Sequence, residues 1–343
     1  MKAKLWILTG LCCSVGVMAW GDKQATLGGQ EGFVERMGGG VREQGLGNVG
    51  VADLQAQPGA YWNPALVASS RQTDVVMGGE QRALGRPGLT FGIQKGFGSR
   101  MGVGVALLGR GVTDFMVVND EDVDLGYANP YWYMLYISLG WRATRQDLIG
   151  LSFARAGENL GISSYFPSEN LKDDGQSPTS YNFGWHHIWN TKWSSGVVVR
   201  NLGFNSDLSA RWVRSSNATG NLSSETFRPK TLEVGTMYHS RLFGRDLSMQ
   251  IEVLDYQLAD TLLVFDPDWH YWTARMGAEY ELIPSGHVRA GYNSGDLSLG
   301  MGYVFNLLWG AKPWPLSVDW ALVYENSAGL WNPLSVGVRT RIP

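Results

Sequence analysis

The residues of this 343-residue chain that could take part in chemistry begin with a group of glycines. Gly45, Gly47 and Gly50 match the G-x-G-x-x-G pattern of dinucleotide-binding loops. Such a loop follows a buried strand, whereas residues 35–44 here are rich in glycine and charge. We therefore interpret these glycines as places where the backbone approaches other parts of the chain closely, because glycine has no Cβ.

An acidic run, Asp-Glu-Asp-Val-Asp, occupies residues 120–124. A calcium-binding EF-hand loop requires a glycine directly after its third acidic position and a glutamate at its twelfth position. Leu125 and Tyr131 occupy those places in this chain. Two interpretations stay open: a solvated loop, or a loose contact between a divalent cation and anionic lipid headgroups.

The histidines offer little support for a metal site or for catalysis. His186 and His187 are adjacent, so on a strand they point to opposite faces and cannot hold one ion together. Asp266, Asp268 and His270 would share a face if extended, but no further ligand is near them in the sequence. Common hydrolase, metalloprotease and P-loop motifs are missing from the sequence. We predict a non-enzymatic protein without a metal site or cofactor.

The first nineteen residues have the pattern of an export signal. Lys2 and Lys4 precede an uncharged apolar stretch that ends in a small-x-small step at Ala19. Lipidation at Cys12 or Cys13 is the alternative, but lipoprotein processing favours a small residue where Leu11 stands. Both cysteines of the chain lie in this segment, so the mature protein is expected to contain no thiol or disulfide.

Composition narrows the class of the mature chain. Loss of Lys2 and Lys4 changes the net charge from −3 to −5, and a mildly acidic chain without basic clusters is a poor nucleic-acid binder. No apolar run after residue 19 is long enough for a transmembrane helix. The chain has 45 glycines, 15 tryptophans and 14 tyrosines, which favours many strands with aromatic ends.

Strict alternation of apolar and small or polar residues recurs after residue 70. Leu89, Phe91 and Ile93 share one face of an extended segment, while Thr90 and Gly92 take the other. Fourteen segments show this pattern and are predicted to be strands: 73–81, 88–96, 100–109, 131–143, 147–157, 181–191, 194–204, 229–240, 246–256, 270–282, 286–292, 297–307, 316–325 and 333–342.

The lengths of the connections alternate between long and short. Long connections at 110–130, 158–180, 205–228 and 257–269 alternate with turns of a few residues. A transmembrane β-barrel has short turns at one end and long loops at the other, whereas a soluble β-sandwich has no reason for this order. The pattern therefore favours an all-β fold, an antiparallel barrel of about 14 strands in the bacterial outer membrane.

Charged and aromatic residues follow the same order. The long connections are acidic and the short turns are basic, which fits the two ends of a barrel or, alternatively, the ordinary solvation of loops. Aromatic residues, among them Trp189 and Trp193, gather near the strand ends, where a membrane–water boundary favours amphipathic rings. The basic turn residues are Arg100, Arg145, Lys192, Arg241 and Arg245.

The stretch Ala60–Ala68, with the sequence AYWNPALVA, is an apolar island in a region of small and polar residues. A fourteen-stranded barrel is too wide to be filled by its own side chains, so its lumen is either a channel or plugged. We expect Tyr61 and Trp62 to pack against the barrel wall or its first strand. We expect Asn63 and Pro64 to be buried inside the barrel, near the end that carries the short turns.

Several motifs in this order resemble the PorV/PorQ-type outer-membrane proteins of the FadL-like fatty-acid-transporter superfamily. Residues 49–53, VGVAD, and Trp62-Asn63-Pro64-Ala65 stand where that family has a similar stretch followed by WNPAGLA. Residues 196–204 and 277–305 resemble its later strands. Leu66 replaces the usual glycine of NPAG, and the chain ends in Pro343 where such barrels commonly end in an aromatic residue.

The resemblance implies a division of the chain into a signal peptide (1–19), an N-terminal hatch in the lumen (20–70) and an outer-membrane barrel (71–343). It implies a component of type IX secretion that holds exported cargo at the outer membrane, or alternatively a FadL-like channel for hydrophobic molecules; a mainly structural barrel is a third possibility. The implied partners are outer-membrane lipid, the barrel-assembly machinery, secreted cargo proteins and a sortase-like surface protease. The expected hatch residues are Tyr61, Trp62, Asn63, Pro64 and Ala65, with Gly38, Gly39, Gly45, Gly47, Gly50 and Asp53.

Overall fold

The computed structural model describes residues 38–82, 85–118, 124–159, 179–203, 209–212, 222–225, 230–257, 270–309, 312–326 and 328–342. The predicted signal peptide, the first part of the predicted hatch, Asp120 to Asp122, and the pair Asp266 and Asp268 lie outside the described residues.

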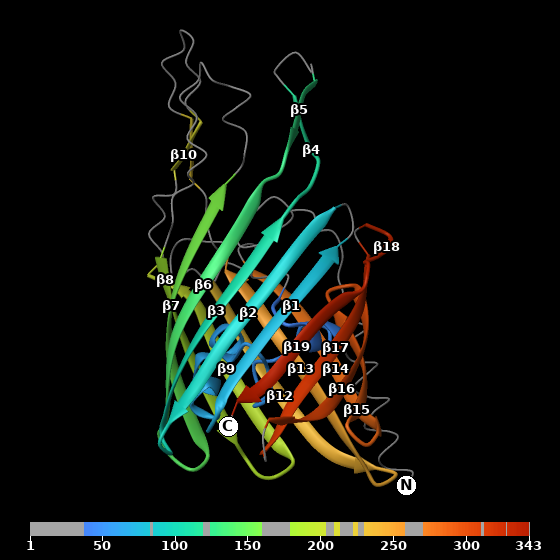
Figure 1. The fold of residues 1–343 in the computed structure, drawn as a ribbon. Coiled ribbons are helices and arrows are strands. Elements are labelled where there is room, and N and C mark those ends of the chain that lie inside the picture. Colours follow the sequence, from blue (N-terminus) through green and yellow to red (C-terminus); the bar gives the residue numbers. More distant parts are fainter. Residues whose placement is uncertain are drawn as a thin grey trace.

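A closed antiparallel barrel of fourteen strands forms the body of the protein (Figure 1). Its strands follow the segments of alternating polarity closely, and neighbours in sequence are neighbours in the wall. They are β1 (Thr73–Arg82), β2 (Arg86–Phe97), β3 (Met101–Gly111), β6 (Tyr131–Arg142), β7 (Asp147–Asn159), β8 (Thr179–Ile188), β9 (Trp193–Leu202), β12 (Lys230–Leu242), β13 (Arg245–Gln257), β14 (His270–Ile283), β15 (Gly286–Asn293), β16 (Asp296–Trp309), β17 (Lys312–Glu325) and β19 (Ser335–Ile342).

The last strand closes the barrel. β19 pairs with β17 on one side and with β1 on the other, where Met77 lies opposite Val338. The two-residue strand β18 (Leu330–Trp331) pairs only with β17, at the rim. The predicted antiparallel barrel and its strand number are confirmed.

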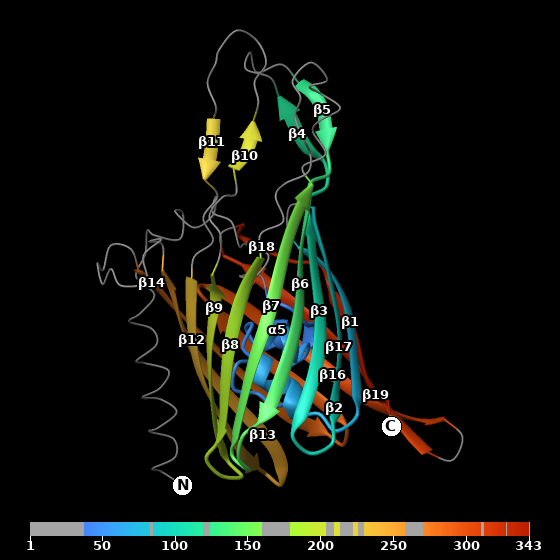
Figure 2. The ribbon, with the colours of Figure 1, turned by 90° about the vertical axis from the view of Figure 1, so that its left-hand side faces the viewer.

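Two small hairpins lie outside the wall, within connections for which the sequence analysis expected only loops. β4 (Phe115–Val118) pairs with β5 (Asp124–Ala128), and β10 (Ser209–Trp212) pairs with β11 (Leu222–Glu225). Figure 2 shows both hairpins beyond one end of the barrel, while the short turns lie at the opposite end. These strands have only four or five residues, too few to establish an alternating pattern.

The two faces of the wall differ in polarity. Along β3, Met101 and Val103 point outward and are exposed, whereas Gly102, Gly104 and Ala106 point inward and are buried. The same order places large apolar side chains on the outside of neighbouring strands, as a lipid-facing surface requires. No described helix has the length and hydropathy needed to cross a membrane.

Residues 38–70, which we call the luminal segment, lie inside the barrel. The segment contains the short helices α4 (Val41–Gly45) and α5 (Gly59–Trp62) and the 3-10 helix η1 (Pro64–Ala68). Figures 1 and 2 show it in blue, enclosed by the strands. Nearly all of its residues are buried; Leu54 and Gln55 are the exposed ones.

Candidate functional site

The candidate site is the contact between the luminal segment and the inner wall, because the segment occupies the lumen of the barrel. The segment first runs along the wall from β19 to β9. A side chain on Gly47 would overlap the backbone of Tyr292 on β15, and one on Gly45 would meet Gly300 on β16. Gly47 also has φ 76°, a conformation that favours glycine.

Gly50 shows the same kind of close approach, but inside the segment itself, where it lies against the ring of Trp62. Gly38 has φ 78° and lies against Asn48, while Gly39 lies beside Tyr61 and Leu108. The structure therefore brings the six expected hatch positions Gly38, Gly39, Gly45, Gly47, Gly50 and Asp53 into the lumen, all of them buried.

A row of five glycines crosses the inner face of the wall near the short turns. Each glycine is the direct cross-strand partner of the next, through β2, β3, β6, β7 and β8. We call these residues the glycine row: Gly96, Gly102, Gly140, Gly150 and Gly184. Without side chains, they leave a smooth track on an otherwise side-chain-covered surface.

The final part of the luminal segment lies along this track. A Cβ on Gly184 would overlap the Asn63 side chain, and one on Gly150 would overlap the Pro64–Ala65 peptide. Further along, Gly102 faces the carbonyl of Val67, and Gly96 faces that of Ser70. The contacts are made largely by main-chain atoms, so the wall and this stretch fit only because the row has no side chains.

Asn63 connects the stretch to both the wall and the segment. Its Nδ2 donates to the carbonyls of Val51 and Trp185, each at 3.0 Å, and its Oδ1 accepts from the Ala65 amide at 3.0 Å. Its backbone is extended, at φ −155°, and Pro64 starts the 3-10 helix. Asn63 and Pro64 are both buried, and they lie near the end of the barrel that carries the short turns.

Tyr61 and Trp62 pack against an apolar area of the wall on β3, β6 and β7, and not against the first strand. The Tyr61 and Tyr136 rings meet edge to face with centroids 5.5 Å apart, and the Trp62 indole donates to the Gly39 carbonyl at 2.9 Å. We call this area the apolar wall; it consists of Ala106, Leu108, Met134, Tyr136, Ala154 and Ala156.

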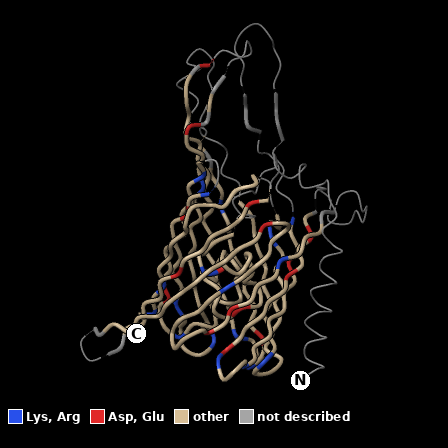
Figure 3. The backbone as a smooth tube through the Cα atoms, turned by 90° about the vertical axis from the view of Figure 1, so that its right-hand side faces the viewer, with Lys and Arg blue, Asp and Glu red and all other residues tan. Residues whose placement is uncertain are grey.

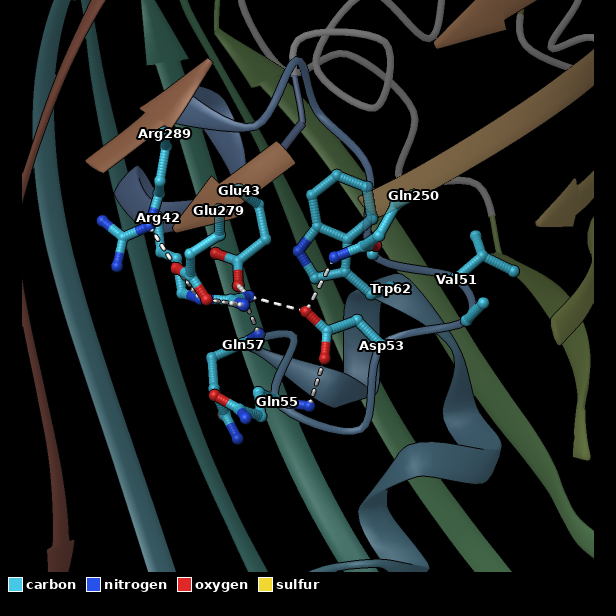
Figure 4. Close-up of polar contacts among 12 residues, drawn as sticks. Arg42, Glu43, Val51, Asp53, Gln55, Gln57, Trp62, Gln250, Glu279 and Arg289 are labelled. Carbon is cyan, nitrogen blue, oxygen red and sulfur yellow. Dashed lines mark hydrogen bonds and ion pairs between the residues drawn. The ribbon is translucent and has the colours of Figure 1, made fainter. Parts of the chain in front are cut away.

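The opposite side of the lumen is charged, and Arg42 of α4 lies at its centre (Figure 4). Arg42 forms ion pairs with Asp53 at 2.8 Å and with Glu279 of β14 at 3.0 Å. Glu279 also contacts Arg289 of β15, which in turn contacts Asp319 of β17 at 2.9 Å. Figure 3 shows such charged positions along the strands of this side.

Glu43 lies beside Arg42 and is fully buried in the luminal segment. It accepts hydrogen bonds from the Arg42 guanidinium at 3.2 Å and from the Gln57 amide at 3.1 Å. Burial raises the pKa of the Glu43 carboxyl to about 7, because the charged form loses its hydration, although Arg42 acts in the opposite direction.

Two charged side chains of the wall hold the backbone of the luminal segment. Arg200 of β9 donates to the carbonyls of Tyr61 at 2.6 Å and Trp62 at 2.9 Å, and is itself paired with Glu233 at 2.9 Å. Glu252 of β13 accepts from the amides of Gly50 at 2.7 Å and Val51 at 2.6 Å. The segment is thus fixed by main-chain contacts on several sides.

The two histidines lie on opposite faces, as predicted. His186 is buried and its Nε2 lies 3.1 Å from the Ala52 carbonyl, whereas His187 faces outward, with its Nδ1 2.7 Å from Asp147. The described part of the chain contains no group of three potential metal ligands. His270 is described as part of β14, without its two predicted partners.

The sequence analysis missed the charged wall residues Arg200, Glu233, Glu252, Glu279 and Arg289. The sequence contains a pattern that could have identified them, because each occupies an inward position of a strand whose outward positions are largely apolar. A charge at such a position of a barrel strand must be paired inside the lumen.

Comparisons with known proteins agree on the fold. No protein-family model matches the chain, and no curated protein matches it. Solved structures match, among them the CymD monoaromatic hydrocarbon channel, with a TM-score of 0.54, 13% identity, and 89% of this chain and 97% of that chain covered. The toluene transporter TbuX of Ralstonia pickettii matches with a TM-score of 0.52, 12% identity, and coverage of 89% and 98%.

A FadL homologue of Pseudomonas aeruginosa matches with a TM-score of 0.51, 11% identity, and coverage of 88% and 97%. At these identities the likeness establishes the fold. The chain has the fold of FadL-like outer-membrane barrels.

Proposed function

We propose that the protein lets small hydrophobic molecules pass the bacterial outer membrane. The observation that carries this proposal is the apolar wall, an inward-facing area on β3, β6 and β7 in a lumen whose other side is charged. Water-filled channels are lined by polar residues, so six apolar inward positions in one area favour an apolar solute. The likeness in fold to a monoaromatic hydrocarbon channel and a toluene transporter supports the same class of solute.

The protein would act without catalysis. Its division into a signal peptide (1–19), a hatch (20–70) and a barrel (71–343) belongs to the same proposal, as do the hatch roles of Tyr61, Trp62, Asn63, Pro64 and Ala65. The luminal segment would close the barrel when no solute is present. Because Tyr61 and Trp62 cover the apolar wall, a solute would displace them or pass beside them.

A role in type IX secretion, with cargo proteins and a sortase-like protease as partners, rests on the sequence resemblance alone. The likenesses in fold favour transport over this role. Membership of the PorV/PorQ group likewise rests on the quoted motifs.

A deletion strain separates the two functions. We expect deletion of the gene to slow uptake of a labelled hydrophobic compound such as toluene, while the set of secreted proteins stays unchanged. An altered set of secreted proteins with unchanged uptake would instead support secretion and end the transport proposal.

A further inference from the structure

Part of the rim that carries the short turns is basic. Three neighbouring hairpins, β2–β3, β6–β7 and β8–β9, make up the basic arc, with five basic residues against one acidic residue. The basic residues are Lys95, Arg100, Arg142, Arg145 and Lys192, and the acidic residue is Asp147.

The acidic residue of this arc is already occupied. Asp147 accepts from the Thr144 hydroxyl at 2.7 Å and the Trp185 indole at 3.2 Å, and it is paired with His187 at 2.7 Å. Within the part of the chain that the structure describes, Lys95, Arg100, Arg145 and Lys192 form no ion pair. Each of the three hairpins therefore offers at least one unpaired cation to its surroundings.

The neighbouring hairpin, β12–β13, behaves differently. Arg241 is paired with Asp246 at 3.1 Å, and Arg245 lies 4.0 Å from Glu281. Its basic residues are thus balanced by acidic partners, although Arg241 and Asp246 are largely exposed to solvent. Unpaired cations are therefore not a feature of every short turn on this rim.

Exposed aromatic rings accompany the unpaired cations. Phe97, Trp141, Trp189 and Trp193 point outward at the ends of β2, β6, β8 and β9, each between 44% and 56% exposed. Such rings favour the boundary between hydrocarbon and headgroups. Long cationic side chains beside such rings are able to reach a headgroup layer. The Lys95 ammonium lies above the Phe97 ring, 6.0 Å from its centroid.

We propose that this basic arc binds the headgroups of anionic phospholipids in the membrane leaflet on the short-turn side. Successive hairpins in a barrel wall lie about 10 Å apart, since each contributes two strands about 4.8 Å wide. The cations are therefore spaced along the rim of the barrel, next to aromatic rings that favour the boundary between hydrocarbon and headgroups. A negative phosphate supplies the charge that the arc lacks, and acyl chains cover its apolar rings. This inference is independent of the transported solute.

The test uses the purified, folded protein in an uncharged detergent. Its melting temperature is measured while phosphatidylglycerol or phosphatidylcholine with identical acyl chains is added. We expect phosphatidylglycerol to stabilise the wild type at a concentration at least about tenfold lower than phosphatidylcholine, and added salt to weaken that preference. Equal effects of the two lipids would overturn the proposal.

A variant with Lys95→Gln, Arg100→Gln, Arg145→Gln and Lys192→Gln is expected to lose the preference. The matched control with Arg241→Gln and Arg245→Gln is expected to keep it, and equal losses in the two variants would contradict a localised arc. If the fourfold variant does not fold, the single changes Arg145→Gln and Lys192→Gln serve, each lowering the preference about fivefold at most. The assignment to lipid would be overturned if glycerol phosphate stabilised the wild type as well as phosphatidylglycerol does. It would also be overturned if the wild type bound purified peptidoglycan and the fourfold variant did not.

Discussion

At the scale of single residues, substitutions in the glycine row test how closely the luminal segment packs on the wall. Gly150→Ala places a Cβ on the Pro64–Ala65 peptide, so the segment or the wall must shift. Overpacking of this kind costs about 1–3 kcal/mol. We expect a lower unfolding midpoint for the reconstituted barrel in denaturant.

Gly79→Ala is the matched control for this change. Gly79 lies on β1 with open space where its Cβ would be, and an alanine there should alter stability by less than about 0.5 kcal/mol. Similar losses in Gly150→Ala and Gly79→Ala would mean that the luminal segment does not rest on the row.

Glu252 provides a second test at this scale, because one carboxylate oxygen accepts from two amides of the luminal segment. Glu252→Ala leaves the amides of Gly50 and Val51 without this acceptor, at a cost of about 1–3 kcal/mol for a buried group. We expect faster hydrogen exchange at both amides, measured by mass spectrometry.

Glu252→Gln keeps an acceptor oxygen in place and should restore most of the protection. The idea that the carboxylate fixes this turn fails if both variants exchange at the wild-type rate, or if the glutamine variant is as unprotected as the alanine variant.

At the scale of elements, most of the wall was accessible from the sequence. β6 begins at Tyr131 and β19 ends at Ile342, where the alternating pattern placed them. The pattern is strong because each strand separates lipid from lumen, so its period of two extends over ten residues or more.

The strand β17 shows where prediction from the alternating pattern fails. The strand begins at Lys312. The sequence analysis placed its start at residue 316, because Pro313 and Pro315 interrupt the alternating pattern. Both prolines pair only with β16, while pairing with β19 begins at Leu316. Proline is tolerated there because its missing N–H would face an unpaired edge. The sequence gives no direct sign of which edges are unpaired.

The path of the luminal segment could be predicted from the sequence less completely than the strands of the wall. The NPA step and the glycines predicted a tight, buried path, whereas the contact of Arg200 with the Tyr61 and Trp62 carbonyls joins residues more than a hundred positions apart. Such a contact depends on how the segment winds inside a closed wall, which local patterns do not encode.

The segment as a whole should determine whether the barrel conducts ions. A fourteen-stranded wall is too wide for its own side chains to fill, so deletion of residues 38–70 should leave an open pore. We expect large, steady single-channel currents in planar bilayers from the deletion variant and none of that size from the wild type. A deletion variant that folds, judged by heat-modifiable migration, yet stays closed would contradict a plugging role.

At the scale of the whole molecule, the lumen has two sides with different chemistry. The charged side fixes the luminal segment through Arg42, Arg200 and Glu252, and the apolar wall packs against Tyr61 and Trp62 of the same segment. In the proposed function, an apolar solute would take the place of these two side chains. Binding there would gain mainly from the apolar area of the solute that leaves water, at about 25 cal/mol per Å², because Tyr61 and Trp62 already cover the wall.

Polarity of the apolar wall should therefore matter more than its shape. Met134→Gln nearly conserves side-chain size but adds an amide to the buried cluster around Tyr61 and Tyr136. We expect uptake of a hydrophobic compound to fall several-fold, while Met134→Leu keeps it near the wild-type rate. Equal rates in the two folded variants would remove the apolar wall from the transport path.

The most direct test of the central claim is the initial rate of uptake of radiolabelled toluene by cells of a deletion strain, with and without the restored wild-type protein. The account predicts a faster rate with the wild type, and a rate close to that of the deletion strain with a Met134→Gln variant present in the outer membrane at the same level. Uptake that is equally slow with and without the wild-type protein, across toluene and a long-chain fatty acid, would contradict a role in hydrophobic transport.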